Sequence, residues 1–420
     1  MFSFFYNACL MLLGLFATPK FLLSWSKYKG TILCRLGLKP PNLQLSSAPV
    51  IWIHAVSAGE TRAATALVAQ LQQAFPDAEI VISNTTRTGH MEAKKSLPQA
   101  KAHFFLPLDF SWIMRRLVKQ ISPKALFLVE SDFWFHLVYH VKKIGGKVVL
   151  VNGKISERSY KRFQFFSYFT RKLFSLFDLF LVQNDTYFKR FSHLADIHKI
   201  HITGNLKWDV TPNLLSLSQK NDLRAQLKLA NKTIILASTH DPEEKWLLEK
   251  LDILWQLFPT LKVLIAPRHP ERFQNVSSLL QKKNYSYALS SNPSQITGEE
   301  QVILIDQMGQ LIKLYQVVDL AIVGGSFVTH IGGHNIFEPV SVGTPVLFGP
   351  YMHTQKDLQQ QILQSQSGLE ITLDNLVETI SKLLSFPLSV SSQNSSSMQG
   401  AAKKTIDFLQ NVVELKAQAR

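Results

Sequence analysis

The sequence predicts an α/β protein with two domains, each built on a parallel β-sheet that carries helices on both faces. Short runs rich in β-branched residues alternate with longer amphipathic segments along most of the chain, which is typical of such sheets. The runs are apolar throughout, as expected for strands buried on both faces. A length of 420 residues exceeds one ordinary hydrophobic core and therefore favours two domains.

The composition describes a folded protein. Hydrophobic residues make up 46% of the chain and charged residues 18%, whereas disordered chains are poor in hydrophobic residues. The only two cysteines, Cys9 and Cys34, lie near the N-terminus. They cannot form a disulfide framework, so the body of the protein needs no oxidising compartment.

The first element, residues 1–25, is expected to be a membrane anchor. Residues 1–19 carry no charge, which is close to the ~20 residues that a membrane-spanning helix needs. The segment lacks the basic start and cleavage site of a signal peptide. The lysines and arginine that follow predict that the next domain lies on the cytoplasmic side of the inner membrane. Gly14 and Pro19 leave open a helix that lies in the membrane interface instead of crossing.

The first α/β domain is expected over residues 26–210. Its strand candidates are residues 50–56, 79–83, 103–108, 124–130, 147–152 and 179–184. Between them, residues 60–75 and 135–146 have the spacing of amphipathic helices.

The pattern stops at an expected linker, residues 211–231, of which residues 218–229 predict a helix. It resumes in a second domain, residues 232–400, with strand candidates at 233–239, 262–270, 302–306, 319–325 and 345–349. A serine-rich patch at 388–400 precedes a final helix within residues 401–420. Two such domains predict a cleft between them, with ligands at the carboxyl ends of the strands.

The formal net charge of +15 predicts an anionic partner. Residues 156–174 interleave lysine and arginine with aromatic residues. They fit either a solvated basic face above a buried aromatic stripe or a surface that sits on anionic lipid headgroups. RNA would also suit the charge, but no recognised RNA-binding motif accompanies it. We therefore expect no nucleic-acid partner.

A carboxylate, Glu60, follows the first strand in "HAVSAGE". It is expected at a helix N-terminus, where unpaired N–H groups normally lower the pKa of a carboxylate and keep it ionised. Ordinary helix capping and a chemical role both fit this position. In "FLVESDFWF", Glu130 and Asp132 directly follow another apolar strand. Because strand ends meet at one edge of a parallel sheet, Glu60 and Glu130 should lie close together.

Two segments of the second domain are candidates for binding an anion. Arg268, in "IAPRHPERF", follows a strand and could fork onto a phosphate or carboxylate, or form a surface salt bridge. The segment "VGGSFVTHIGGHNIFEP" has two glycine pairs that allow backbone N–H groups to approach a phosphate, and Glu338 one turn into a helix could bind a ribose. A glycine-rich turn without a ligand is the simpler alternative.

Several signatures do not occur in the sequence. There is no G-x-x-x-x-G-K-[ST] phosphate loop, no G-x-G-x-x-G after the first strand and no Cys/His cluster with zinc spacing. We therefore expect neither a metal nor a cofactor.

Seven segments, taken in order, give the chain a resemblance to the 3-deoxy-D-manno-octulosonic acid (Kdo) transferases of Gram-negative lipopolysaccharide assembly. They are "HAVSAGE", "VESDFW", "TGNLKWD", "APRHPERF", "VGGSF", "GGHNIFEP" and "GTPVLFGPY". The resemblance covers the chain from the anchor to the end of the second domain. It implies a GT-B glycosyltransferase fold, with two Rossmann-like α/β domains facing an interdomain cleft.

The resemblance also implies an activity and roles for individual residues. Such an enzyme transfers Kdo from CMP-Kdo to the lipid A precursor with inversion, and Glu60 would be the general base. Glu130, Lys207 and Arg87 would contact the acceptor or the sugar, and Lys207 would face the leaving phosphate or the Kdo carboxylate. The donor CMP would contact these residues: Arg268, Gly325, Ser326, Phe327, Asn335 and Glu338.

The chain departs from the family pattern at one place. Members commonly read "E-T-E-L-W-P-N" where this sequence has "ESDFWFH". Asp132 replaces a glutamate, and Phe135 and His136 replace proline and asparagine. Two other functions stay open at this point: another GT-B activity, such as a UDP-GlcNAc epimerase, and a non-catalytic membrane-bound binder of nucleotide or lipopolysaccharide precursor.

Overall fold

The computed structural model describes residues 2–23, 30–210, 212–386 and 400–412. The chain forms two compact units, of which the first comprises Met1–Val210 with Gln399–Arg420 and the second Thr211–Met398. The serine-rich patch, apart from Gly400, lies outside the described residues, as do the last two residues of the expected anchor.

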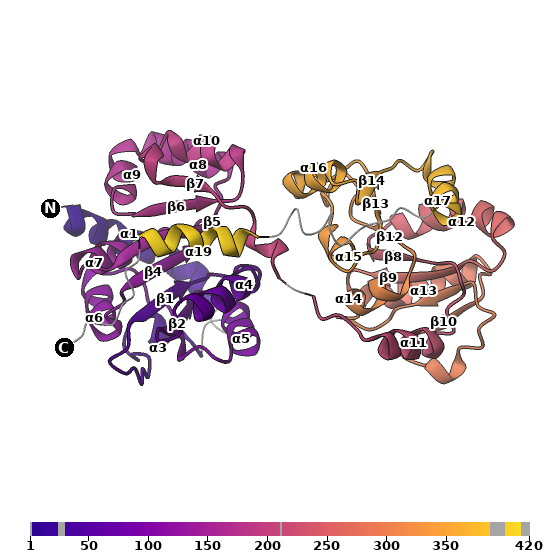
Figure 1. Ribbon diagram of the computed structural model, residues 1–420, viewed down its shortest axis with the longest axis horizontal. Coiled ribbons are helices and arrows are strands. Elements are labelled where there is room, and N and C mark those ends of the chain that lie inside the picture. Colours follow the sequence, from indigo (N-terminus) through magenta and orange to yellow (C-terminus); the bar gives the residue numbers. More distant parts are fainter. Residues whose placement is uncertain (1, 24–29, 211, 387–399, 413–420) are drawn as a thin grey trace. The chain divides into compact units, whose positions relative to one another are not determined.

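Unit 1 begins with α1 (Phe2–Leu23) and α3 (Ile32–Arg35) and then alternates strands and helices (Figure 1). Its strands are β1 (Val50–His54), β2 (Glu79–Asn84), β3 (Ala102–Phe105), β4 (Ala125–Val129), β5 (Lys147–Gly153), β6 (Leu179–Val182) and β7 (Ile200–Ile202). Its further helices are α4 (Ala58–Ala74), α5 (Arg87–Ser96), α6 (Ser111–Ile121), α7 (Phe135–Lys143), α8 (Glu157–Phe165), α9 (Ser167–Phe174), α10 (Asp185–Ser192), η1 (Ile197–Lys199), η2 (Leu206–Trp208) and α19 (Ala401–Val412).

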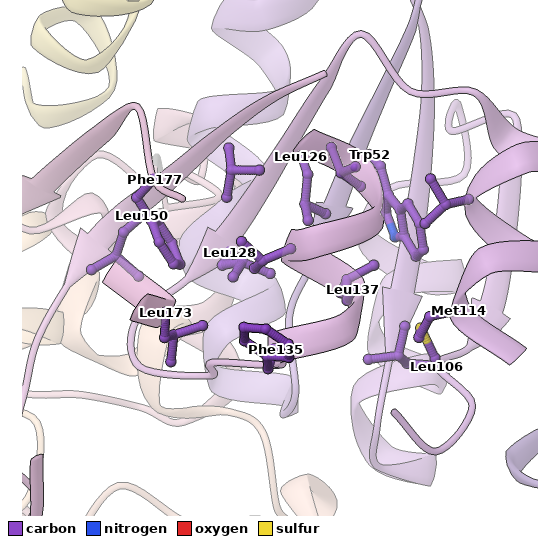
Figure 2. Close-up of a cluster of buried hydrophobic side chains, with 14 of the residues drawn as sticks. Trp52, Leu106, Met114, Leu126, Leu128, Phe135, Leu137, Leu150, Leu173 and Phe177 are labelled. Carbon is purple, nitrogen blue, oxygen red and sulfur yellow. The ribbon is translucent and has the colours of Figure 1, made fainter. Parts of the chain in front are cut away.

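The seven strands of unit 1 form one parallel sheet in the order β3-β2-β1-β4-β5-β6-β7. The strand order reverses between β1 and β4, and ligands of open α/β sheets bind outside the carboxyl ends of the strands at such a point. In β1, residues with odd and even numbers belong to different hydrophobic clusters. Ile51 and Ile53 lie in the cluster with α4 and α19, whereas Trp52 lies in the cluster with α6 and α7 (Figure 2). The sheet is therefore buried on both faces, as predicted.

Unit 2 repeats the same architecture (Figure 1). Its strands are β8 (Thr233–Thr239), β9 (Lys262–Pro267), β10 (Tyr287–Leu289), β11 (Val302–Leu304), β12 (Leu320–Val323), β13 (Val346–Phe348) and β14 (Gly368–Glu370). Its helices are α11 (Leu217–Gln226), α12 (Glu243–Leu257), η3 (Pro270–Arg272), α13 (Phe273–Lys282), η4 (Pro293–Gln295), α14 (Leu311–Leu314), η5 (Tyr315–Val317), α15 (Phe337–Ser341), α16 (Lys356–Gln364) and α17 (Leu376–Ser385).

The second sheet is also parallel, in the order β10-β11-β9-β8-β12-β13-β14, and its order reverses between β8 and β12. The helix expected in the linker, α11, packs within this unit, because the Arg224 guanidinium donates to the carbonyl of Val317 at 2.6 Å. Both units thus offer a ligand-binding position of the same kind at the carboxyl edge of a sheet.

The C-terminal helix α19 returns to unit 1 and packs beside α4, as Figure 1 shows. Its buried residues Ala402, Ile406 and Leu409 join the cluster that covers one face of the first sheet. The carboxylate of Asp209 accepts from the Gly400 N–H at 2.7 Å and from the Ala402 N–H. One side chain thus satisfies N–H groups at the start of the helix, where they have no partner inside it.

The N-terminal helix α1 packs on unit 1 through aromatic rings. Phe2 contacts Phe135 of α7 with ring centroids 4.7 Å apart, and Tyr6 stacks on Phe169 of α9 at 5.9 Å. In the part of the chain that the structure describes, no helix is both long and apolar enough to cross a membrane.

The aromatic rings of the segment 156–174 divide into buried and exposed ones. Phe163, Phe169 and Phe174 pack into or against the core of unit 1. Phe165 and Phe166, at the junction of α8 and α9, are 82% and 59% exposed. The segment therefore has both a buried aromatic stripe and an exposed aromatic edge.

Candidate active site

Glu60 is the third residue of α4, and its carboxylate closes the turn that joins β1 to this helix. Ser57 is the N-cap, and its hydroxyl oxygen accepts from the Glu60 N–H. In return, Glu60 Oε2 accepts from the Val56 N–H at 2.6 Å and Oε1 accepts from the Ser57 hydroxyl at 3.1 Å. This reciprocal pairing is close to a capping box, so Glu60 does stabilise its helix.

The electrostatics of Glu60 differ from the expectation that its pKa is lowered. Burial raises the pKa of Glu60 above its ordinary value, and the hydrogen bond from Val56 offsets only part of this effect. The negative charges of Glu130 and Asp132 raise the pKa further, so these three carboxylates share one neighbourhood. The closeness of Glu60 and Glu130 agrees with the prediction. A raised pKa suits a general base, which works best when its pKa approaches the working pH.

Glu130 directly follows β4 and has a positive φ of 69°, a strained conformation for a residue with a side chain. Its carboxylate is buried between two ammonium groups. Lys207 Nζ lies 2.9 Å from Oε1, and Lys154 Nζ contacts Oε2. Burial by itself would raise the pKa of Glu130, but Lys207 and Lys154 outweigh it and hold the pKa below its ordinary value.

Glu130 and Lys207, which the sequence analysis selects separately, are thus in direct contact, and Lys154 is the second cation on Glu130. Sequence reasoning missed Lys154. It is the first residue after β5, the strand beside β4, so the search for polar residues at strand ends could have found it. Both lysines remain partly exposed, with 37% of the Lys154 side chain and 44% of the Lys207 side chain accessible.

Asp132 is held by a buried histidine that no motif of the sequence singles out. His54 ends β1 and is fully buried. Its Nε2 lies 2.8 Å from Asp132 Oδ2 and its Nδ1 lies 2.8 Å from the Ser83 hydroxyl. The Trp134 indole N–H donates to the same Asp132 oxygen at 2.5 Å. These contacts fix the loop that carries Glu130 against the end of β1.

Arg87 is the first residue of α5, and its side chain is exposed. The preceding Thr86 donates to the Val56 carbonyl from its hydroxyl at 2.8 Å and from its N–H at 3.0 Å. Gly89 lies so close to this turn that a Cβ there would be 2.8 Å from the Val56 oxygen. Arg87 therefore lies beside the turn that carries Glu60.

The family departure at Phe135 and His136 has a structural explanation. Both side chains are buried, and the His136 N–H donates to Asp109 Oδ2 at 2.9 Å. His136 Nε2 lies 2.8 Å from the Ser3 hydroxyl, and Phe135 packs on Phe2. The two residues thus hold α1 against α7.

In unit 2, the glycine-rich turn after β12 is already occupied by a side chain of the protein. Glu243 is fully buried at the start of α12. Its Oε2 accepts from the Gly325 N–H at 2.8 Å and its Oε1 accepts from the Phe327 N–H at 3.0 Å. These two N–H groups, expected to face the donor, therefore donate to Glu243. Ser326 is also buried, with its hydroxyl donating to the Val323 carbonyl at 2.6 Å.

The other predicted donor residues remain accessible. Arg268 follows β9 and is exposed, and its backbone N–H donates to the Thr239 carbonyl. Asn335 is also exposed; its side-chain amide donates to Glu338 Oε1 at 3.2 Å, and its Oδ1 accepts from the Phe337 N–H. Asn335 and Glu338 thus lie together where α15 begins. Over the described ranges, no group of three His, Cys, Asp or Glu side chains is placed to hold a metal ion.

Comparisons with known proteins agree on one family. A family model for 3-deoxy-D-manno-octulosonic-acid transferase (kdotransferase) matches residues 31–210. The chain is 35% identical over 393 residues to the 3-deoxy-D-manno-octulosonic acid transferase of Chlamydophila psittaci, covering 92% of this chain and 89% of that protein. It is 34% identical over 337 residues to the enzyme of the same name from Haemophilus influenzae, covering 80% of this chain and 79% of that protein.

Solved structures support the fold. The UDP-GlcNAc 2-epimerase of Neisseria meningitidis bound to UDP-GlcNAc matches with a TM-score of 0.61 and 13% identity, over 86% of this chain and 100% of that chain. A glycosyltransferase from Rickettsia africae matches with a TM-score of 0.59 and 14% identity, over 88% of this chain and 100% of that chain. At these identities the likeness concerns the fold alone, which is a GT-B-like α/β fold with two parallel sheets.

Proposed function

The chain belongs to the 3-deoxy-D-manno-octulosonic acid (Kdo) transferase family, and from this premise we propose that it moves Kdo from CMP-Kdo to the lipid A precursor and releases CMP. Family membership makes it a glycosyltransferase; the donor, the acceptor and the residue roles below are proposals. The observation that carries them is the carboxyl edge of the first sheet. There the half-buried Glu60, with its raised pKa, shares a neighbourhood with the Glu130–Lys207 pair.

Glu60 acts as the general base of an inverting displacement. Its carboxylate takes the proton of the acceptor hydroxyl as that oxygen forms a bond to the anomeric carbon of Kdo. The bond from this carbon to the phosphate oxygen breaks, and its electron pair leaves with CMP. Attack from the face opposite CMP inverts the anomeric carbon through an oxocarbenium-like transition state.

Unit 2 holds the donor. The exposed Arg268 guanidinium suits a phosphate oxygen, while Asn335 and Glu338 offer an amide and a carboxylate for the ribose hydroxyls. The turn formed by Gly325, Ser326 and Phe327 supports this site and does not bind the phosphate through the Gly325 and Phe327 N–H groups, because both donate to Glu243. No metal is required by this assignment.

Unit 1 holds the acceptor, which is an acylated disaccharide with two phosphates. Lys154 and Lys207 keep partly exposed ammonium groups beside Glu130, and Arg87 adds an exposed guanidinium next to the Glu60 turn. Three cations at one sheet edge suit phosphate groups or the carboxylate of Kdo. Such an acceptor lies in a membrane, so we place the enzyme at the cytoplasmic face of the inner membrane.

The test compares wild type with Glu60→Gln. Glutamine keeps the acceptor for the Val56 N–H but cannot take up a proton. The detergent-solubilised proteins are incubated with CMP-Kdo and tetraacylated lipid A precursor, and both the lipid product and CMP are quantified. Glu79→Gln is the matched control, because Glu79 begins β2 at the opposite end of the same sheet.

We expect product and CMP from wild type and Glu79→Gln, and a loss of about 100-fold or more in Glu60→Gln. Equal turnover in Glu60→Gln would return Glu60 to helix capping alone. No turnover by wild type, beside an active Kdo transferase, would overturn the proposed donor and acceptor.

A further inference from the structure

Two histidine side chains lie in contact at the carboxyl edge of the second sheet, near Arg268. His240 follows β8 and His334 precedes α15, and their Nε2 atoms lie only 2.7 Å apart. The two rings stack with centroids 4.9 Å apart and 16° between their planes. The ring centroid of His269 lies 5.5 Å from that of His240, and His269 is next in sequence to the exposed Arg268.

Two imidazole nitrogens at this distance share a single proton. One ring donates and the other accepts, an arrangement that two neutral imidazoles can satisfy. Burial, together with the smaller effect of neighbouring basic groups, lowers the pKa of His240 and of His334 to about 4. The basic groups around the pair are Arg268, His269, Arg272 and His330. The neutral pair is thus surrounded by basic groups, whose positive charge would attract an anion to it.

The nearby backbone donors are not available to an anion. Glu243 accepts from the N–H groups of Gly325 and Phe327, and its Oε2 also accepts from the His240 N–H at 2.9 Å. A concave set of N–H groups of this kind commonly binds phosphate. Here a buried carboxylate fills it, and its negative charge repels a second anion. The imidazole rings and the Arg268 guanidinium offer side-chain donors at this edge.

We propose that the His240–His334 pair, together with Arg268, binds the phosphate of the nucleotide donor, and that the pair takes up one proton from solvent when this anion binds. The inference rests on the proposed function and deepens it. A phosphate beside the pair favours its protonated form, and the two rings titrate as one unit. In the protonated pair each ring has an N–H to donate, and the added positive charge stabilises the charge that develops on the leaving phosphate.

Isothermal titration calorimetry with CMP tests the proposal. Titrations near neutral pH in two buffers of different ionisation enthalpy give the number of protons exchanged on binding. We expect net uptake by wild type, and loss of that uptake with about tenfold or more weaker CMP binding in His334→Gln and in His240→Gln. Cytidine, which lacks the phosphate, should bind wild type and both variants equally. His198→Gln, an exposed histidine of unit 1, should behave as wild type.

The wild-type protein alone also gives a decisive result, should a variant fail to fold. Its affinity for CMP relative to cytidine should rise as pH falls from about 8 to 6.5, a range above the second pKa of a phosphate monoester near 6. CMP binding without proton uptake and without this pH dependence would overturn the proposal. Uptake that persists in both variants would do so too. Failure of the proposed function looks different, because wild type would then bind CMP with proton uptake yet transfer no Kdo.

Discussion

At the scale of single residues, Glu60 illustrates how one carboxylate serves both a helix and a reaction. Its contacts with Ser57 and Val56 favour the ionised form, whereas its burial and the neighbouring Glu130 disfavour it. The second influence is larger, so the pKa is raised. A base with this property takes up a proton more readily than an ordinary glutamate and costs the fold some stability when ionised.

This conflict predicts how Glu60→Gln changes stability. A raised pKa means that the folded state binds the proton more tightly than the unfolded state. The contribution of Glu60 to stability is therefore greatest below its unfolded pKa and is lost as pH rises through its folded pKa. At neutral pH we expect Glu60→Gln to have an unfolding free energy equal to or above that of wild type, measured by urea denaturation. A clear loss of stability at neutral pH would contradict this balance.

The pKa of Glu130 is shifted in the opposite direction to that of Glu60. Its lowered pKa means that its contribution is present above its unfolded pKa and is lost as pH falls through its folded pKa. Glu130→Gln leaves Lys154 and Lys207 without their buried partner. Because both lysines are over a third exposed, we expect a loss of only about 2 kcal/mol at neutral pH, shrinking toward zero in acid. Urea denaturation at several pH values measures this loss of unfolding free energy. Glu157→Gln, which breaks the exposed ion pair of Glu157 with Lys161, should show no change.

The sequence was informative where a polar residue immediately follows an apolar run. Glu60, Glu130 and Arg268 were found in this way, and the structure places each at a sheet edge. His54 was not found, because it is the last residue inside an apolar strand and its partner Asp132 is distant in sequence. The role of Glu243 was equally hidden, since it depends on backbone N–H groups that lie more than eighty residues away.

At the scale of elements, long buried strands were predictable, whereas β7, β10 and β14 at the sheet edges were not. β1 and β8 carry continuous apolar runs, whereas β7, β10 and β14 have three residues each, and β7 and β14 include a polar residue. They form only because a neighbouring strand supplies hydrogen bonds. Predicted strands also ran too far at Gly324 and Gly325, where the backbone leaves the sheet to approach Glu243.

The packing of α19 on unit 1 is another feature that depends on contacts between residues distant in sequence. Leu409 is completely buried against the cluster around α4, whereas Lys403 on the same helix is exposed. We expect Leu409→Ala to lower the unfolding free energy of unit 1 by about 2–4 kcal/mol, and Lys403→Ala to change it little. Urea denaturation of the full chain measures both. Equal stability of the two variants would show that α19 contributes no core packing.

At the scale of the whole molecule, the net charge of +15 favours association with an anionic partner. An exposed aromatic edge accompanies part of this charge in unit 1. We define it by Phe4, Phe5, Phe165, Phe166 and Tyr168, which are between 59% and 82% exposed. The contact of Phe2 with Tyr168, at 6.1 Å between ring centroids, joins α1 to the junction of α8 and α9. Exposed aromatic rings interleaved with lysine and arginine are typical of proteins that lie on anionic membranes.

Vesicle binding decides whether this edge contacts lipid. The double variant Phe165→Ser with Phe166→Ser should bind phosphatidylglycerol vesicles about fivefold or more weakly than wild type, because it loses apolar area that enters the interface. Phe386→Ser is the matched control, since Phe386 is 78% exposed but belongs to unit 2. Binding to zwitterionic vesicles should be weak throughout, and added salt should weaken binding to anionic ones. Two results would contradict this prediction. Unchanged vesicle binding by the phenylalanine variant would show that the aromatic edge is not a membrane contact. Displacement of the protein from anionic vesicles by single-stranded RNA, at equal phosphate concentration, would show that the positive charge prefers nucleic acid.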